Sequence, residues 1–212
     1  MDFGVAIFPT DETPDPATLA RMAEERGFES LFFPEHTHIP VSRRTPYPVG
    51  GDLPREYART FDPLVALSFA AAATTTLKLA PGLMLVAQRD PIVTAKAIAS
   101  LDVLSGGRVL LGVGAGWNIE EMEDHGVDPA RRFGRVRESV EAMRALGLRP
   151  AEIAGLRKRM LDSPMSESSI AGAALIAPLA DATRTALLAG LPGELTQYAM
   201  QARSHPIARG HA

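Results

Sequence analysis

Two histidines in the segment FPEHTH, residues 33–38, carry side chains that could transfer protons or bind a metal ion. His36 follows the apolar run Ser30–Phe33, which we predict to be a strand of a parallel sheet. A residue just past the carboxyl end of such a strand lies where α/β proteins place their sites, and imidazole exchanges protons near pH 7. His36 is therefore a candidate acid or base; the alternative is a loop histidine bonded to a carbonyl group or to solvent.

A metal site at His36 and His38 is a less favoured interpretation. Zinc would need further nitrogen or oxygen ligands, and the other histidines, at positions 125, 205 and 211, follow no recognisable strand. The chain contains no cysteine, which excludes thiolate ligands, disulfides and a cysteine nucleophile. We therefore predict no metal ion in this site.

Glycines at alternate positions form a second candidate, Gly112-x-Gly114-x-Gly116, and Trp117, the only tryptophan, follows them. A dinucleotide-binding turn would read G-x-G-x-x-G after the first strand, whereas this motif follows the fourth predicted strand and has Trp117 at the final glycine position. The spacing instead favours a flat ring packed against glycine backbone. Trp117 could form an aromatic wall, but a core position is its default interpretation.

The dipeptide Pro81-Gly82 lies inside another predicted strand, where a regular strand should carry neither residue. Interior glycine often marks a β-bulge or a place where a ligand meets the backbone. Because the two irregular strands are consecutive and parallel, their irregularities would lie side by side at one edge of the sheet. A simple bulge at Gly82-Leu83 explains the pattern without a ligand.

Four Asp-Pro pairs mark the starts of the helices that must position these residues, because aspartate caps free N–H groups and proline suits the first turn. The pairs begin at residues 15, 62, 90 and 128. The last helix would place Phe133, Val136, Val140 and Met143 on one apolar face. Four strands are expected before residue 115, the first at Val5–Phe8. Strands that alternate with capped helices predict an α/β fold with a parallel sheet or barrel.

The Pro-rich segment Pro34–Thr60 is long for a loop in a compact domain, which is typical of a lid or a binding loop. Charged clusters elsewhere are interpreted as solvated surface. We expect Glu120, Glu121 and Glu123 to form the solvated side of a helix. The arginine pairs at 43–44 and 131–132 could contact an anion, but exposed charge is their default interpretation.

The composition is that of an ordinary soluble globular protein, with 46% hydrophobic and 22% charged residues among 212. The formal net charge of −3 argues against a nucleic-acid or anionic-membrane surface. The opening MDFGVAIFPT lacks the basic region of a signal peptide, and the longest apolar runs are too short to span a bilayer. We expect a cytoplasmic protein with no nucleic-acid or membrane partner.

Residues 79–117, LAPGLMLVAQRDPIVTAKAIASLDVLSGGRVLLGVGAGW, resemble the luciferase-like family of flavin- and deazaflavin-dependent oxidoreductases. The likeness is greatest to the single-domain branch that uses the deazaflavin coenzyme F420. The segments FGVAIFPT, FFPEHTHIP and RRFGRVRESVEAMRAL agree in order and spacing. The resemblance therefore covers roughly residues 1–146.

This resemblance implies a TIM-barrel-like (β/α)₈ fold with the coenzyme at the carboxyl edge of the strands. Residues 1–146 would form the barrel half that carries this edge. Residues 147–212 would be a shortened, largely helical C-terminal segment of the same domain, so we expect an incomplete barrel. Strands left without neighbours would favour a homodimer.

The resemblance also implies the site. Gly82-Leu83 would be a non-proline cis peptide that backs the central ring of the coenzyme, with Met84 next to it. Glu35 and His36 match the acid–histidine pair that faces the ring and the substrate. The turn along the coenzyme matches Gly114, Ala115, Gly116, Trp117 and Asn118. Some deazaflavin enzymes place a catalytic glutamate at the position of Trp117, so their acid–base scheme is not carried over.

The predicted function is hydride transfer between coenzyme F420 and a small organic substrate, with His36 giving or taking a proton. An FMN-dependent luciferase-like monooxygenase is one alternative. A non-catalytic, degenerate flavin-binding barrel is another, which the short second half favours.

Overall fold

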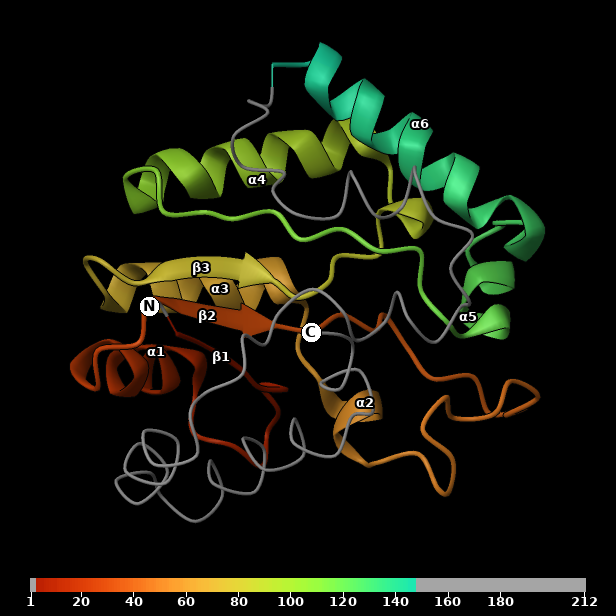
Figure 1. Cartoon of the computed structure of the whole chain (residues 1–212), viewed down its shortest axis with the longest axis horizontal. Helices are drawn as coiled ribbons and strands as arrows, with labels where there is room; N and C mark the ends of the chain where they lie inside the picture. The colour runs from red at the N-terminus through yellow and green to blue at the C-terminus, as the bar shows by residue number, and fades with distance from the viewer. Residues whose placement is uncertain (1–2, 148–212) are drawn as a thin grey trace, which may run out of the picture.

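The alternation of strands and helices predicted from the sequence is confirmed by the computed structural model, which describes residues 3–147. Strands β1 (Gly4–Ala6), β2 (Ser30–Phe33) and β3 (Lys78–Pro81) are parallel and lie in the order β1-β2-β3 (Figure 1). β1 is shorter than predicted, although Ile7 N–H still donates to Phe32 O (3.1 Å).

The fourth predicted strand lies beside β3 but is not a regular strand. Two isolated parallel bridges join residues 109–113 to the preceding segment, at Leu79 and at Met84. Between these bridges lies the cis peptide bond Gly82-Leu83, and pairing resumes where Met84 N–H donates to Gly112 O (2.8 Å). The expectation of a regular fourth strand is wrong because the bulge in its neighbour interrupts the hydrogen-bond ladder.

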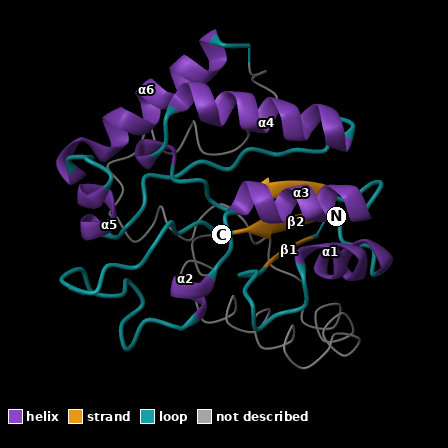
Figure 2. Ribbon diagram, turned by 180° about the vertical axis from the view of Figure 1, so that it is seen from behind, coloured by secondary structure: helices purple, strands orange, loops and turns teal. Residues whose placement is uncertain are grey.

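The four longer helices form one layer in chain order: α1 (Pro16–Glu25), α3 (Pro63–Ala73), α4 (Pro91–Ser105) and α6 (Arg132–Ala145). α1 packs against α3, α3 against α4 and α4 against α6 (Figure 2). The connections contain the short helices α2 (Glu56–Arg59) and α5 (Ile119–Asp124) and the 3₁₀ turns η1 (Val86–Gln88) and η2 (Pro129–Arg131). Successive parallel strands backed by helices are the arrangement of a barrel wall.

Three of the four Asp-Pro pairs cap α-helices as predicted. The side chains of Asp15, Asp62 and Asp90 each accept hydrogen bonds from two backbone N–H groups of the first helical turn. Asp128 instead begins the turn η2, and α6 follows at Arg132. Caps of this kind contribute about 1 kcal/mol each.

The core lies between the sheet and the helix layer, where Leu31 of β2 packs toward Leu19 of α1. On α6, Val136 and Met143 are buried as predicted. Phe133 is 38% exposed, so its predicted place on the buried face is wrong. Phe133 lies in the first turn of α6 and lines a cavity instead.

The described residues therefore form an α/β unit of successive parallel strands, as expected for part of a barrel. The helical segment predicted for residues 147–212 lies outside the described residues, except for Gly147. Within residues 3–147, no helix is long and apolar enough to cross a membrane.

Gly112 provides a test of the contact between the bulge and the fourth segment. A Cβ atom at Gly112 would lie 2.6 Å from Pro81 O, so the backbone must shift to accept it. We expect Gly112→Ala to lower the free energy of unfolding by about 1–3 kcal/mol. Gly134 in α6 is the control, because nothing lies within 4 Å of its added Cβ and alanine should stabilise the helix by about 0.5–1 kcal/mol. Denaturant unfolding measures both, and equal stability of Gly112→Ala and wild type would contradict the account.

Candidate active site

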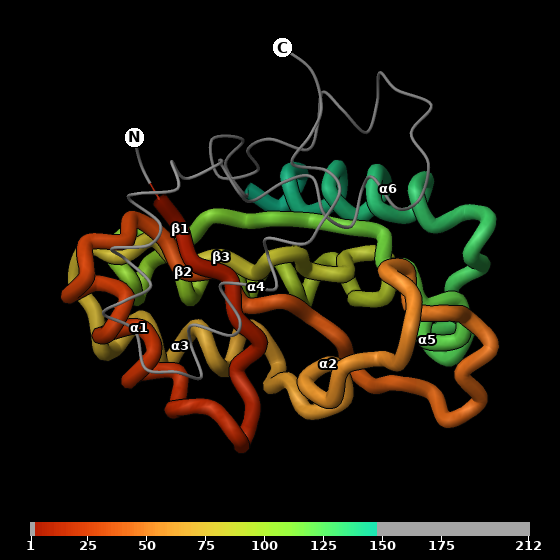
Figure 3. The backbone as a smooth tube through the Cα atoms, turned by 60° about the horizontal axis from the view of Figure 1, so that its bottom comes forward, coloured from red at the N-terminus to blue at the C-terminus, as the bar shows by residue number. Residues whose placement is uncertain are grey.

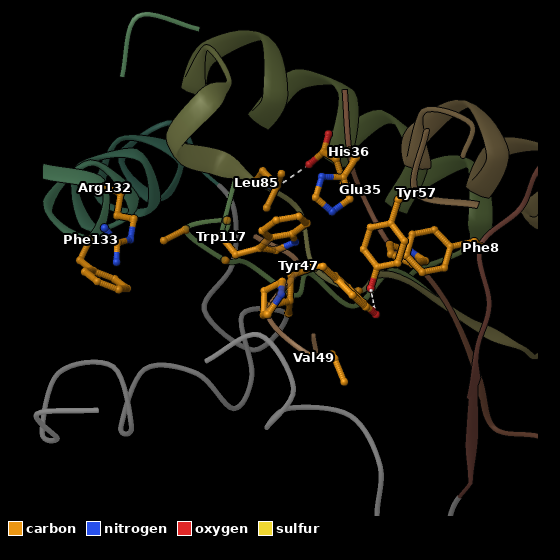
Figure 4. Close-up of a pocket in the computed structure, with 17 residues that line it drawn as sticks. Phe8, Glu35, His36, Tyr47, Val49, Tyr57, Leu85, Trp117, Arg132 and Phe133 are labelled. Carbon is orange, nitrogen blue, oxygen red and sulfur yellow. Dashed lines mark hydrogen bonds between the residues drawn. The ribbon is translucent and has the colours of Figure 1, made fainter. Parts of the chain in front are cut away.

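A cavity of about 250 Å³ lies at the carboxyl ends of the strands. Its walls come from the ends of β1 and β2, the loop 34–60, the bulge after β3, the glycine-rich turn and the start of α6 (Figure 4). All the sequence-predicted site residues except Met84 and Asn118 line this cavity. Met84 is fully buried in the core, and Asn118 is buried at the N-terminus of α5.

The bulge forms one wall of the cavity. The predicted cis peptide bond at Gly82-Leu83 is present, and the Leu83 side chain lies against the glycines of the next segment. An added Cβ at Gly114 would lie 2.9 Å from Leu83 Cδ1. The glycines at 112 and 114 therefore leave room for the bulge. Gly114 and Gly116 also line the cavity, and the packing of a flat ring against them stays a prediction.

His36 projects into the cavity with its side chain only 6% exposed. Its Nδ1 lies 2.8 Å from Glu121 Oε2, so this nitrogen is bonded to a carboxylate instead of a carbonyl group or solvent, and the acid or base role of His36 stays a prediction. The His36 ring also contacts Tyr57 and Trp117, with centroids 5.3 and 5.6 Å away. His38 turns elsewhere, because its Nε2 pairs with Asp124 Oδ2 at 2.9 Å.

Glu120 and Glu121 are buried, 3% and 0% exposed, so their predicted place on a solvated helix face is wrong. Glu121 accepts from Thr37 N–H (2.9 Å), and Glu120 accepts from Thr45 N–H (3.0 Å). Burial tends to raise the pKa of Glu120, but the bonds from Thr45 and neighbouring backbone groups outweigh it and hold the pKa at about 2. Glu123 is exposed, as predicted, and pairs with Arg44.

The acids of α5 therefore hold the loop 34–60 in place, and Figure 3 shows this loop lying against α5. The loop brings Tyr47 and Tyr57 to the cavity, with their hydroxyl groups 3.2 Å apart. Burial raises the pKa of Tyr57, so its phenol stays protonated. The loop thus lines the cavity, as expected for a binding loop, although no sequence pattern indicated that these tyrosines take part.

Trp117 is half-buried and forms an aromatic wall of the cavity, so the default expectation of a core position is wrong. Its ring centroid lies 6.1 Å from that of Tyr47 and 6.3 Å from that of Tyr57. Arg132, expected to be solvated, also lines the cavity, with its guanidinium carbon 4.6 Å from the centre of the Phe133 ring.

Glu35 is buried at the end of β2 and its carboxylate turns toward the bulge (Figure 4). It accepts hydrogen bonds from Leu85 N–H and from Arg89 Nε (2.6 Å). Arg89 also binds Asp62 Oδ2 (2.7 Å), the residue that caps α3. Burial raises the pKa of Glu35, and Arg89 opposes that increase. The carboxylate thus connects β2 with the segment after the bulge and, through Arg89, with α3. A catalytic role of Glu35 stays a prediction.

Glu120 gives a pH-dependent prediction. Because its folded-state pKa is about 2 against an ordinary 4.5, its contribution to stability is complete above pH 4.5 and is lost as the pH falls toward 2. We expect Glu120→Gln to lower the free energy of unfolding by about 1–3 kcal/mol at pH 7 and to flatten the acid limb of the stability curve. Glu123→Gln, on the same helix, should change stability by less than about 0.5 kcal/mol. Equal effects of the two variants in urea titrations would refute this assignment.

Comparison with known proteins identifies relatives of the chain. The family model described as "Luciferase-like monooxygenase" matches residues 1–175. An uncharacterized protein of Mycobacterium tuberculosis is 50% identical over 149 residues, which are 69% of this chain and 53% of that protein. The chain thus spans about half the length of this relative.

Solved structures show the same fold. The monooxygenase RslO1 from Streptomyces bottropensis is similar with a TM-score of 0.56 and 28% identity, over 69% of this chain and 43% of that one. An F420-dependent secondary alcohol dehydrogenase, in complex with an F420-acetone adduct, is similar with a TM-score of 0.53 over 71% of this chain and 43% of that one. Its 24% identity supports the fold alone. By its sequence match and its parallel βα units, the chain belongs to the luciferase-like monooxygenase family.

Proposed function

We propose that the protein is an oxidoreductase that transfers a hydride between coenzyme F420 and a small organic substrate. The observation that supports this most strongly is the cavity itself, which joins a backbone bulge, aromatic rings and one histidine at the carboxyl edge of the sheet. That edge is where barrel enzymes carry out their chemistry.

The residues present fit a flat heteroaromatic ring. Leu83 and the peptide before it form an apolar surface on one side, and Trp117 with Tyr57 forms an aromatic surface on another. The cavity volume of about 250 Å³ is close to the lower end of small-molecule sites, about 300–1,000 Å³. This space suits a ring and a small substrate rather than a whole coenzyme with its tail.

When bound, a deazaflavin supplies or accepts the hydride at its C5 atom. The protein's own part is to place the substrate and to move one proton. As a substrate carbonyl carbon gains the hydride with its two electrons, the carbonyl oxygen takes a proton from protonated His36, which becomes neutral. Alcohol oxidation reverses both transfers. Trp117, Tyr47 and Tyr57 keep water from the reacting atoms.

An FMN-dependent monooxygenase is the second candidate, supported by the likeness to the monooxygenase RslO1 at 28% identity. The two differ in their use of oxygen, since a monooxygenase inserts an oxygen atom and a deazaflavin reductase turns over without oxygen. Turnover that requires oxygen and FMN would support the second candidate.

The homodimer and the cytoplasmic location expected from the sequence are also proposals. Apolar side chains lie exposed on the outer faces of two neighbouring helices, with Val65 and Phe69 on α3 and Ile92 and Val93 on α4. A second copy of the chain would cover them. Sedimentation of the full chain as a monomer would contradict the homodimer.

His36→Ala tests the proposed function. We expect the variant to lower kcat by roughly 10²- to 10⁴-fold, because the proton donor is lost, and to change the Kd of the coenzyme much less. Reoxidation of reduced F420 with a panel of small ketones and aldehydes measures the turnover. His38→Ala is the control, since its imidazole faces Asp124 and does not line the cavity. Unchanged kcat in His36→Ala would show that His36 moves no proton.

A further inference from the structure

We propose that Glu121 is the positioning residue of His36, holding the imidazole in the tautomer and orientation that proton transfer requires. This inference rests on the proposed function of His36. It concerns a carboxylate that lies outside the cavity lining and reaches the reaction only through the histidine.

The geometry of the carboxylate supports this role. Glu121 is fully buried on α5, and both of its oxygens have donors. Oε2 lies 2.8 Å from His36 Nδ1, while Oε1 accepts from Thr37 N–H at 2.9 Å and from the Thr37 hydroxyl group at 3.2 Å. A carboxylate held by two neighbouring residues of the same loop has little freedom to turn.

This contact decides which nitrogen of the imidazole carries the proton. A carboxylate only accepts hydrogen bonds, so His36 Nδ1 must be the donor. Neutral His36 then has its free electron pair on Nε2, at the other side of a ring that lines the cavity. Nε2 is therefore the atom that takes up and gives back the proton.

The same contact gives the imidazolium a partner of opposite charge. When Nε2 gains a proton, the imidazolium lies directly against a buried carboxylate that compensates its charge. The other rings in contact with His36 are Tyr57, which stays protonated, and Trp117, which carries no charge. The Glu35 carboxylate, next in the chain, is directed to Arg89. Among the described residues, Glu121 is thus the carboxylate that pairs with His36.

A base oriented by a buried acid recurs in unrelated enzymes that activate a nucleophile. Replacing the acid there leaves the residues in place but permits the wrong tautomer. If Glu121 had only a structural role, it would hold the loop backbone through Thr37 N–H, as Glu120 does through Thr45 N–H. The two roles differ in one measurable property, the tautomer of His36.

The first experiment records the ¹⁵N signals of the His36 ring by NMR in the coenzyme-free full chain, at a pH where the ring is neutral. We expect a proton on Nδ1 and none on Nε2 in the wild type. Detection of the Nε2–H tautomer in the wild type would overturn the proposal without any variant, so its test does not depend on how a variant folds.

The second experiment compares Glu121→Gln with Glu123→Gln, a matched loss of one charge on the same helix. We expect Glu121→Gln to populate the Nε2–H tautomer and to lower kcat at least about 10-fold, with the coenzyme Kd changed less than about 3-fold. Glu123→Gln should leave the tautomer and kcat unchanged. If Glu121→Gln keeps the Nδ1–H tautomer and full kcat while His36→Ala is impaired, the positioning role fails and the proposed function survives. If His36→Ala retains full turnover, the proposed function itself fails.

Discussion

The close approach between the bulge after β3 and the segment beside it is the constraint on which the site depends. Pro81 O occupies space that a side chain at Gly112 would fill, and the Leu83 side chain does the same at Gly114. The hydrogen bonds of Leu79 before the bulge and of Met84 after it keep the two segments in register. The next segment therefore leaves the sheet at a fixed point, where Gly116, with φ of +79°, turns the chain toward Trp117 and α5. The wall of the cavity and the helix that holds His36 both follow from this contact.

Burial of two neighbouring carboxylates on α5 is the second constraint. An unpaired buried carboxylate would be costly, but Glu120 and Glu121 each have several donors from the loop 34–60. The loop in turn depends on these acids, because much of its backbone has no regular partner strand or helix. Helix, loop and histidine thus form one unit, in which both acids bond the loop and Glu121 also holds His36. Glu35 has a comparable place at the end of β2. It accepts from Leu85 and Arg89 in the segment after the bulge, and Arg89 in turn binds Asp62 at the start of α3.

Local chemistry in the sequence predicted the framework well. The Asp-Pro pairs predicted helix starts because a cap needs only residues within one turn. The bounds of β2 and the position of His36 at its end were also predicted, since both follow from one short apolar run. The roles of Glu120 and Glu121 were not predicted, because acids in a first helical turn are ordinarily solvated and their donors lie 75 to 85 residues away. Tyr47 and Tyr57 were missed for the same reason, since only the folded chain brings their rings close to Trp117.

The proposed function requires that the cavity beside the bulge receive a deazaflavin ring. A fluorescence titration of the folded full chain with coenzyme F420 and, separately, with FMN tests this directly. We expect saturable binding of F420, with Trp117 emission quenched as the ring fills the cavity that this side chain lines. Saturable binding of FMN alone would support the FMN-dependent monooxygenase instead. Binding of neither by a folded sample would contradict the account and leave a degenerate barrel.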